Sequence, residues 1–97
     1  MNIKFLPEAK VELDDAVAYY ELQVKGLGLT FKNIAKTTIK RIATLPKAWT
    51  EIRPEIRRCI MHKFPYNVLY SIEKDTTLVI AIYHHHRNPN YWIDRMN

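Results

Sequence analysis

Histidines and an arginine lie together near the end of the chain, where they could take part in acid–base or phosphate chemistry. His84, His85 and His86 are consecutive, and Arg87 follows them directly. In an extended strand neighbouring side chains point to opposite faces, so His85 points away from the other two histidines. The three histidines therefore cannot bind one metal ion, and apart from His62 no nearby Cys or His could complete a zinc site. We expect no metal and no cofactor, and we expect the histidines to act as general acid or base or to line a groove.

A second group of cations surrounds the only cysteine of the chain, Cys59. Alternation along an extended segment places Arg58 and His62 on one face, and Arg57 on the other face together with Cys59. A small thiol among apolar neighbours is typical of a buried core residue. We therefore expect Arg58 and His62 to lie on the face of the sheet that no other element covers, with Lys63 directly after the strand.

The elements that position these residues follow from hydrophobic periodicity and predict the order β-α-α-β-β-β. An opening strand is expected at 2–6, one helix beginning at Pro7, and a second helix ending at Pro46. The remaining expected elements are a loop at 47–55 and strands at Ile56–His62, Tyr66–Glu73 and Thr77–His84. The predicted fold class is therefore α+β, a small single domain over residues 1–97 in which a helical hairpin packs on one face of a mainly antiparallel sheet.

Apolar residues indicate how the last strand and the tail should pack. Residues 78–83 are apolar on both faces, so this strand is expected inside the sheet, and the pattern leaves open which face carries His84. Trp49 is expected to pack against the core, with a role in recognition as the alternative. After Arg87 we expect a short turn or helix that is anchored by Trp92, with Tyr91 pointing back over the sheet.

The charge of the chain is unevenly distributed. Among its 97 residues the net charge is +5, but residues 1–27 carry three Lys/Arg against five Asp/Glu, and residues 28–97 carry 12 against 5. A net −2 beside a net +7 indicates a basic surface for an anionic partner, with a mixed solvated surface as the alternative. No apolar stretch approaches the about 18 residues of a membrane span, and the N-terminus lacks the features of an export signal, so a cytoplasmic location without membrane contact is expected.

Three local motifs occur in a fixed order along nearly the whole chain. They are FLPEA at 5–9, RR at 57–58 followed by FPYNVLY at 64–70, and HHHRNPNYW at 84–92. Together they resemble the RelE/ParE superfamily of toxins from bacterial type II toxin–antitoxin systems, which includes plasmid-stabilisation proteins. The resemblance implies a growth inhibitor that is neutralised by a cognate antitoxin, which covers the toxin with helices and adds an extended segment to the sheet edge.

The ribonuclease branch of this superfamily cuts mRNA on the ribosome without a metal. Such cleavage needs a base for the ribose 2′-proton, cations for the charge on the phosphorane and an acid for the leaving oxygen. The residues expected in these roles are His84 or His86 as base, Arg58 and Arg87 as phosphate clamps, and Tyr91 as acid or stacking platform. Lys63 and Arg57 are further cations for binding RNA or the target. The alternatives are an ion pair for Arg58 and a solvated strand end for Lys63.

The gyrase-poisoning branch acts by binding and needs no acid–base residues. The long helical hairpin, with Asp14 and the pair Tyr19-Tyr20 in its first helix, resembles this ParE-like branch, which is our leading interpretation. A RelE-like ribosome-dependent endoribonuclease is the alternative. Two further alternatives are a non-toxic basic module that binds nucleic acid and an inactive family member that is kept as a scaffold.

Overall fold

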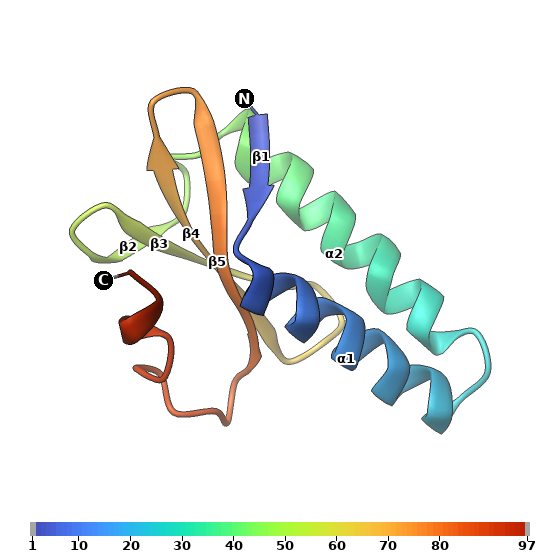
Figure 1. Cartoon of the computed structure of the whole chain (residues 1–97). Coiled ribbons are helices and arrows are strands. Elements are labelled where there is room, and N and C mark those ends of the chain that lie inside the picture. Colours follow the sequence, from blue (N-terminus) through green and yellow to red (C-terminus); the bar gives the residue numbers. More distant parts are fainter. Residues whose placement is uncertain (1, 97) are drawn as a thin grey trace.

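Two helices lie side by side on one face of a five-stranded sheet, and the C-terminal segment crosses the other face (Figure 1). The computed structural model describes residues 2–96. Its elements are β1 (Asn2–Phe5), α1 (Pro7–Gln23), α2 (Leu27–Thr44), β2 (Thr50–Arg53), β3 (Ile56–Ile60), β4 (Tyr66–Glu73), β5 (Thr76–His84) and the 3₁₀ helix η1 (Ile93–Met96). This arrangement confirms the predicted α+β class and the predicted helical hairpin.

The strands are ordered β1-β5-β4-β3-β2 across the sheet. Only the β1–β5 pair is parallel, and the other neighbouring pairs are antiparallel. Because β5 lies between β1 and β4, the prediction of an inner last strand is confirmed. The apolar residues on both sides of β5 are buried there by the two layers that cover the sheet.

Two predicted boundaries at the other edge of the sheet are wrong. The expected loop at 47–55 contains β2, a short edge strand that pairs with β3 and ends before Pro54. A turn joins the two strands, and the Glu51 carboxylate closes it by accepting the backbone N–H of Glu55 at 3.0 Å. The strand expected at Ile56–His62 ends at Ile60, because the chain then turns toward β4.

The helical hairpin is held together by a close approach of its two helices. A Cβ atom on Gly28 would lie 2.5 Å from the carbonyl oxygen of Val17, so only glycine fits there without a shift. The Glu21 carboxylate accepts the backbone N–H groups of Gly26 at 2.9 Å and of Gly28 at 3.0 Å. These bonds satisfy amides at the start of α2 that have no partner within the helix. The hairpin is therefore a tightly joined unit.

A β-bulge in β5 decides which side chains face each layer. The register between β4 and β5 shifts after Leu69, and β5 has one extra residue there, Ile80. Ile80 and Ala81 consequently both pack on the side of the C-terminal segment, whereas Ile82 packs on the helical side. His84, two residues after Ile82, therefore lies on the helical side, which the sequence pattern left open.

The sequence led us to expect that no element covers the second face of the sheet, and this prediction is wrong. Trp92 of the C-terminal segment is 1% exposed and packs on Leu69, Ile80 and Tyr83. Its indole N–H donates to the carbonyl oxygen of Pro89 at 2.6 Å. Trp92 is therefore the apolar anchor that was predicted, and the segment that it anchors covers part of this face. Neither helix of the described chain combines the length and apolar composition that a membrane-spanning segment requires.

Candidate functional site

The C-terminal segment is fastened to the first helix through a carboxylate, Glu12. Its Oε1 atom accepts the backbone N–H of Ile82 at 3.1 Å and Nη1 of Arg95 at 2.8 Å. Its Oε2 atom accepts Nη2 of Arg95 at 3.0 Å and the Tyr91 hydroxyl. The side chains of Glu12 and Arg95 are only 13% and 14% exposed. Because the Glu12–Arg95 ion pair is bidentate and largely buried, it fixes both the position and the orientation of the segment.

Tyr91 lies at the centre of this arrangement. The guanidinium carbon of Arg87 lies 3.9 Å from the centre of the Tyr91 ring, and that of Arg95 lies 4.8 Å from it. The Tyr83 ring meets it edge-on at 5.5 Å between centroids. Burial, followed by the bond to the Glu12 carboxylate, raises the pKa of Tyr91 above its usual 10.0. Because the hydroxyl is a weak acid that already donates to Glu12, this geometry favours a packing or stacking role over a general acid.

His84 and Arg87 line one pocket of about 350 Å³ where the end of β5 meets α1. The Nδ1 atom of His84 accepts the backbone N–H of His86 at 3.1 Å, which orients the imidazole ring. The Tyr66 ring meets His84 edge-on at 5.4 Å. The carboxylates of Glu12 and Asp15 line the same pocket. The charge around Arg87 is therefore mixed, which weakens its value as a phosphate clamp.

The structure does not gather the five catalytic candidates in one cleft. Arg58, His86 and Tyr91 line none of the five principal pockets formed by residues 2–96. Arg58 pairs across the sheet with Leu69, so it lies on the face opposite the helices as predicted, although the C-terminal segment partly covers that face. It forms no ion pair or side-chain hydrogen bond with another residue of that range. His62, which was expected on the same face, lies beyond the end of β3 and lines a pocket with Thr38 and Arg41 of α2. No group of three His, Cys, Asp or Glu residues in the described chain is placed to hold a metal ion.

Of the remaining candidates, Arg57 lies beside Arg58 near the start of β3, and Lys63 follows the end of the strand. Nη1 of Arg57 donates to the carbonyl oxygens of Lys47 at 3.3 Å and Trp49 at 2.7 Å, so this guanidinium fastens the loop before β2. Lys63 is exposed in the turn between β3 and β4, with a φ of 70°. Cys59 is 4% exposed, and burial raises the pKa of its thiol, which confirms a core cysteine.

Glu12 and Arg95 organise the site, and neither was predicted from the sequence as a site residue. The available signal is the position of Glu12 on α1, three residues after Ala9 and four before Ala16, both of which are buried. An acid on the apolar stripe of a helix requires a buried partner. The sequence does not show that this partner is Arg95, because the two residues are 83 positions apart.

Comparisons with known proteins agree with this fold. Residues 3–89 match the family model described as the ParE toxin of the type II toxin–antitoxin system parDE. The chromosomal ParDE toxin–antitoxin system of P. aeruginosa contains a chain that is 14% identical, with a TM-score of 0.66, and the match covers 87% of this chain and 95% of that one. The isolated RelE toxin of E. coli is 16% identical, with a TM-score of 0.66 and coverage of 99% and 98%. Curated protein sequences give no significant match.

At these identities the two solved structures establish the fold alone, whereas the family model spans most of the chain. The model also includes the first two motifs and the histidine run on which the resemblance to the RelE/ParE superfamily rests, and that resemblance is confirmed. The chain belongs to the ParE toxin family of type II toxin–antitoxin systems.

Proposed function

We propose that this toxin arrests growth by binding and poisoning DNA gyrase and that a cognate antitoxin neutralises it. The observation that carries the proposal is that Tyr91 and Arg87, which a ribonuclease would need for catalysis, are engaged in contacts within the protein. The Tyr91 hydroxyl donates to Glu12, and the Arg87 guanidinium lies on the Tyr91 ring. These side chains serve the packing of the C-terminal segment, and an activity based on binding does not need them free.

The tip of the helical hairpin offers a surface for binding a protein target. Four apolar side chains near the turn between α1 and α2 are exposed: Tyr19 at 54%, Leu22 at 89%, Val24 at 59% and Leu29 at 61%. Exposed apolar residues that lie close together are typical of protein interaction sites. Because Glu21 and Gly28 hold the turn rigid, little conformational entropy is lost when the tip binds.

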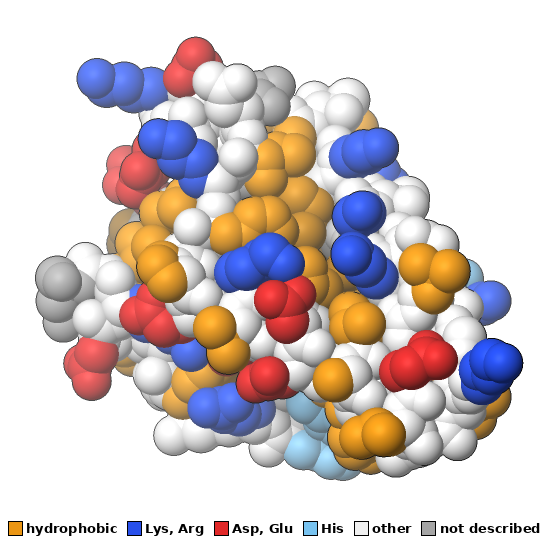
Figure 2. Space-filling view, turned by 45° about the vertical axis from the view of Figure 1, so that its right-hand side comes forward, with side chains coloured by type: hydrophobic (Ala, Val, Ile, Leu, Met, Phe, Trp, Pro, Cys, Tyr) orange, Lys and Arg blue, Asp and Glu red, His pale blue; other side chains and the backbone are white. Residues whose placement is uncertain are grey.

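The antitoxin has a separate surface available to it, a groove of about 410 Å³ between β1 and the two helices. Its apolar lining comprises Ile3, Phe5, Leu13 and Ile39, and its basic lining comprises Lys10, Lys32, Lys36 and Lys40. Figure 2 shows hydrophobic side chains in this furrow with basic side chains beside them. The outer edge of β1 pairs with no other strand of the described sheet. An acidic antitoxin segment with apolar anchors fits both the charge and the open edge.

Growth measurements test the toxin and antitoxin parts of this proposal. We expect induction of the chain alone to arrest growth and co-expression of the neighbouring small gene to restore it. Lys32→Glu with Lys36→Glu should retain toxicity but escape neutralisation, because the groove then repels an acidic segment. Lys47→Glu, which makes the same charge change at an exposed position outside both the groove and the hairpin tip, is the matched control. Unimpaired growth on induction of the chain alone contradicts the proposal.

Purified gyrase tests the target. We expect the chain to inhibit supercoiling and to increase the amount of DNA that is covalently attached to gyrase, and we expect Leu22→Glu at the hairpin tip to abolish both effects. The matched control is Lys47→Glu, which introduces the same acidic side chain at an exposed position at the opposite end of the hairpin. Undiminished supercoiling by gyrase, in the presence of a chain that arrests growth, contradicts gyrase as the target.

A further inference from the structure

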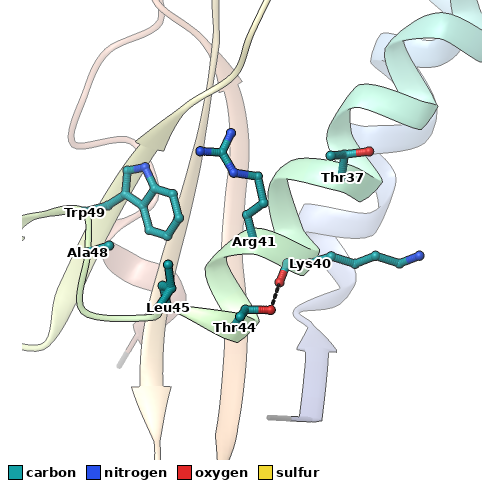
Figure 3. Close-up of a pocket in the computed structure, with 7 residues that line it drawn as sticks. All are labelled: Thr37, Lys40, Arg41, Thr44, Leu45, Ala48 and Trp49. Carbon is teal, nitrogen blue, oxygen red and sulfur yellow. Dashed lines mark hydrogen bonds between the residues drawn. The ribbon is translucent and has the colours of Figure 1, made fainter.

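Two hollows adjoin at Arg41 and Trp49, and we call them together the Arg41–Trp49 cleft. The larger, of about 490 Å³, lies at the C-terminal end of α2, where Lys40 and Leu45 also line it (Figure 3). The smaller, of about 330 Å³, extends toward the end of β3 and includes His62. In Figure 3 the indole of Trp49 faces the side chain of Arg41, and the guanidinium carbon is 5.8 Å from the ring centre.

The loop that carries Trp49 is held in place from the sheet. Tyr70, which is fully buried, donates its hydroxyl to the carbonyl oxygen of Pro46 at 2.6 Å. Arg57 donates to the carbonyl oxygens of Lys47 and Trp49. One part of the indole packs against the helical-side core, which confirms the predicted packing of Trp49, and the rest lines the cleft. The aromatic surface is therefore preorganised and loses little entropy when it binds a ligand.

The charge of the cleft is entirely basic. Lys40, Arg41 and His62 line the two hollows, and neither is lined by an Asp or Glu residue. The ammonium group of Lys40 and the guanidinium of Arg41 form no ion pair or hydrogen bond with another residue of 2–96, although Arg41 lies over the Trp49 ring. Both cations are exposed at the end of α2, but in Figure 3 the Lys40 side chain extends away from Trp49, whereas Arg41 reaches toward the indole. The Arg41 guanidinium is therefore the cation available to an anionic ligand that lies on the ring.

We propose that the Arg41–Trp49 cleft binds single-stranded nucleic acid, with one base stacked on Trp49 and its phosphate against Arg41. A flat indole beside a free cation is the combination by which proteins hold unpaired nucleotides. An acidic peptide would use the same cation, but it would leave the indole surface without a matching planar group. The contact goes beyond gyrase poisoning and does not depend on it, and its ligand chemistry is common to DNA and RNA.

Fluorescence of the intact purified chain tests the proposal directly. The chain has two tryptophans, and because Trp92 is 1% exposed, a ligand in the cleft should quench only Trp49. The probes are a short thymidine DNA oligonucleotide and the uridine RNA of equal length. Quenching by either probe, weakening as salt is added, supports the cleft and shows which sugar it accepts. The absence of quenching by both probes at low salt overturns the proposal.

Variants locate the binding site. In Trp49→Phe, which keeps an aromatic ring, the remaining Trp92 emission should not respond to the probe. Trp49→Ala should weaken binding of a dye-labelled probe by about ten-fold or more, the size expected for one lost stacked base. Arg41→Gln should lower the salt dependence by about 0.7 in the slope of log K against log salt, as expected for one lost phosphate contact to a single strand.

Lys25→Gln is the matched control, because it removes the same charge at the other end of α2 and should leave binding unchanged. Thermal melting of each variant shows whether it is folded, and Trp49→Phe keeps the test valid if Trp49→Ala is not. Equal weakening by Lys25→Gln and Arg41→Gln overturns the proposal, because it indicates diffuse attraction. Displacement of the DNA probe by an equal concentration of oligo-glutamate also overturns it, in favour of an acidic peptide.

Discussion

The two faces of the sheet are covered in different ways. On one face α1 and α2 bury a large apolar cluster, and the helices are joined by a tight glycine turn. On the other face a short C-terminal segment buries a small cluster around Trp92, and it is held by the polar contacts of Glu12 with Tyr91 and Arg95. The helical layer thus depends on packing and the C-terminal layer depends on a polar fastening. Substitutions should therefore affect the two layers by different mechanisms.

The largest effect is expected where both layers meet, in β5. Ile80 is fully buried, so Ile80→Asp places an unpaired charge inside the sheet, at a cost comparable to a total stability of about 5–10 kcal/mol. We expect this variant to be unfolded by circular dichroism. Ile60→Asp is the control, since Ile60 is 59% exposed and its substitution should leave the chain folded. Cooperative melting of Ile80→Asp at the wild-type temperature would show that β5 is misplaced.

Glu12→Gln tests the polar fastening alone. The substitution leaves the sheltered charge of Arg95 without its partner, which should cost about 2–4 kcal/mol and shift the Trp92 emission to longer wavelength. Asp14→Asn removes a carboxylate of the exposed pair with Lys10, whose side chains are 61% and 55% exposed, and should cost at most about 0.5 kcal/mol. If the two variants melt at the same temperature, Glu12 does not hold the segment.

Gly28→Ala tests the packing of the helical layer. The added Cβ would lie 2.5 Å from the Val17 carbonyl oxygen and 2.9 Å from Cβ of Glu21, so the helices must move apart. We expect a loss of about 1–3 kcal/mol in chemical denaturation, with Trp92 emission in the native state unchanged. A Trp92 emission shift as large as that of Glu12→Gln would mean that the two layers are not separate.

Tyr91→Phe should have the smallest effect, because it removes one hydroxyl and keeps the ring beside Arg87 and Arg95. We expect a loss of about 1 kcal/mol near neutral pH. Burial is the main cause that raises the pKa of Tyr91 and that of Tyr70, the latter to about 12.

The pH dependence follows from the sign of these shifts. A phenol whose pKa is higher in the folded chain contributes stability that is fully present below the unfolded value of 10.0 and is lost as the pH rises through the folded value. The wild type should therefore lose stability above about pH 10, and Tyr91→Phe should lose less of it. Equal slopes for the two proteins in melts between neutral and alkaline pH contradict a buried Tyr91 hydroxyl.

The sequence predicted the features that depend on local patterns. The helices, the inner position of β5 and the buried Trp92 follow from periodicity, proline positions and residue size, and all three are confirmed. β2 was missed because a four-residue edge strand beside Pro54 has too short a pattern. The bulge at Ile80 cannot be predicted from a strand that is apolar on both faces, so the structure was needed to determine which side of the sheet carries His84.

The candidate site was less predictable than the fold because its contacts are long-range. Glu12 lies one turn after Glu8 in the N-terminal half of α1, so an acid there already has a local explanation in the helix dipole, and its bonds to Tyr91 and Arg95 were not expected. The family resemblance identified Arg87 and Tyr91 as residues of interest. It did not indicate that the Arg87 guanidinium lies 3.9 Å from the centre of the Tyr91 ring.

Mapping of RNA ends in cells that express the chain tests most directly the claim that Arg87 and Tyr91 fasten the C-terminal segment and do not cut RNA. Wild type and Arg87→Ala would be induced to the same protein level, and mRNA 5′ ends sequenced before growth stops. If this claim is correct, no codon-phased cuts appear with either protein, although the wild type arrests growth. Codon-phased cuts that appear with the wild type and disappear with Arg87→Ala would contradict it.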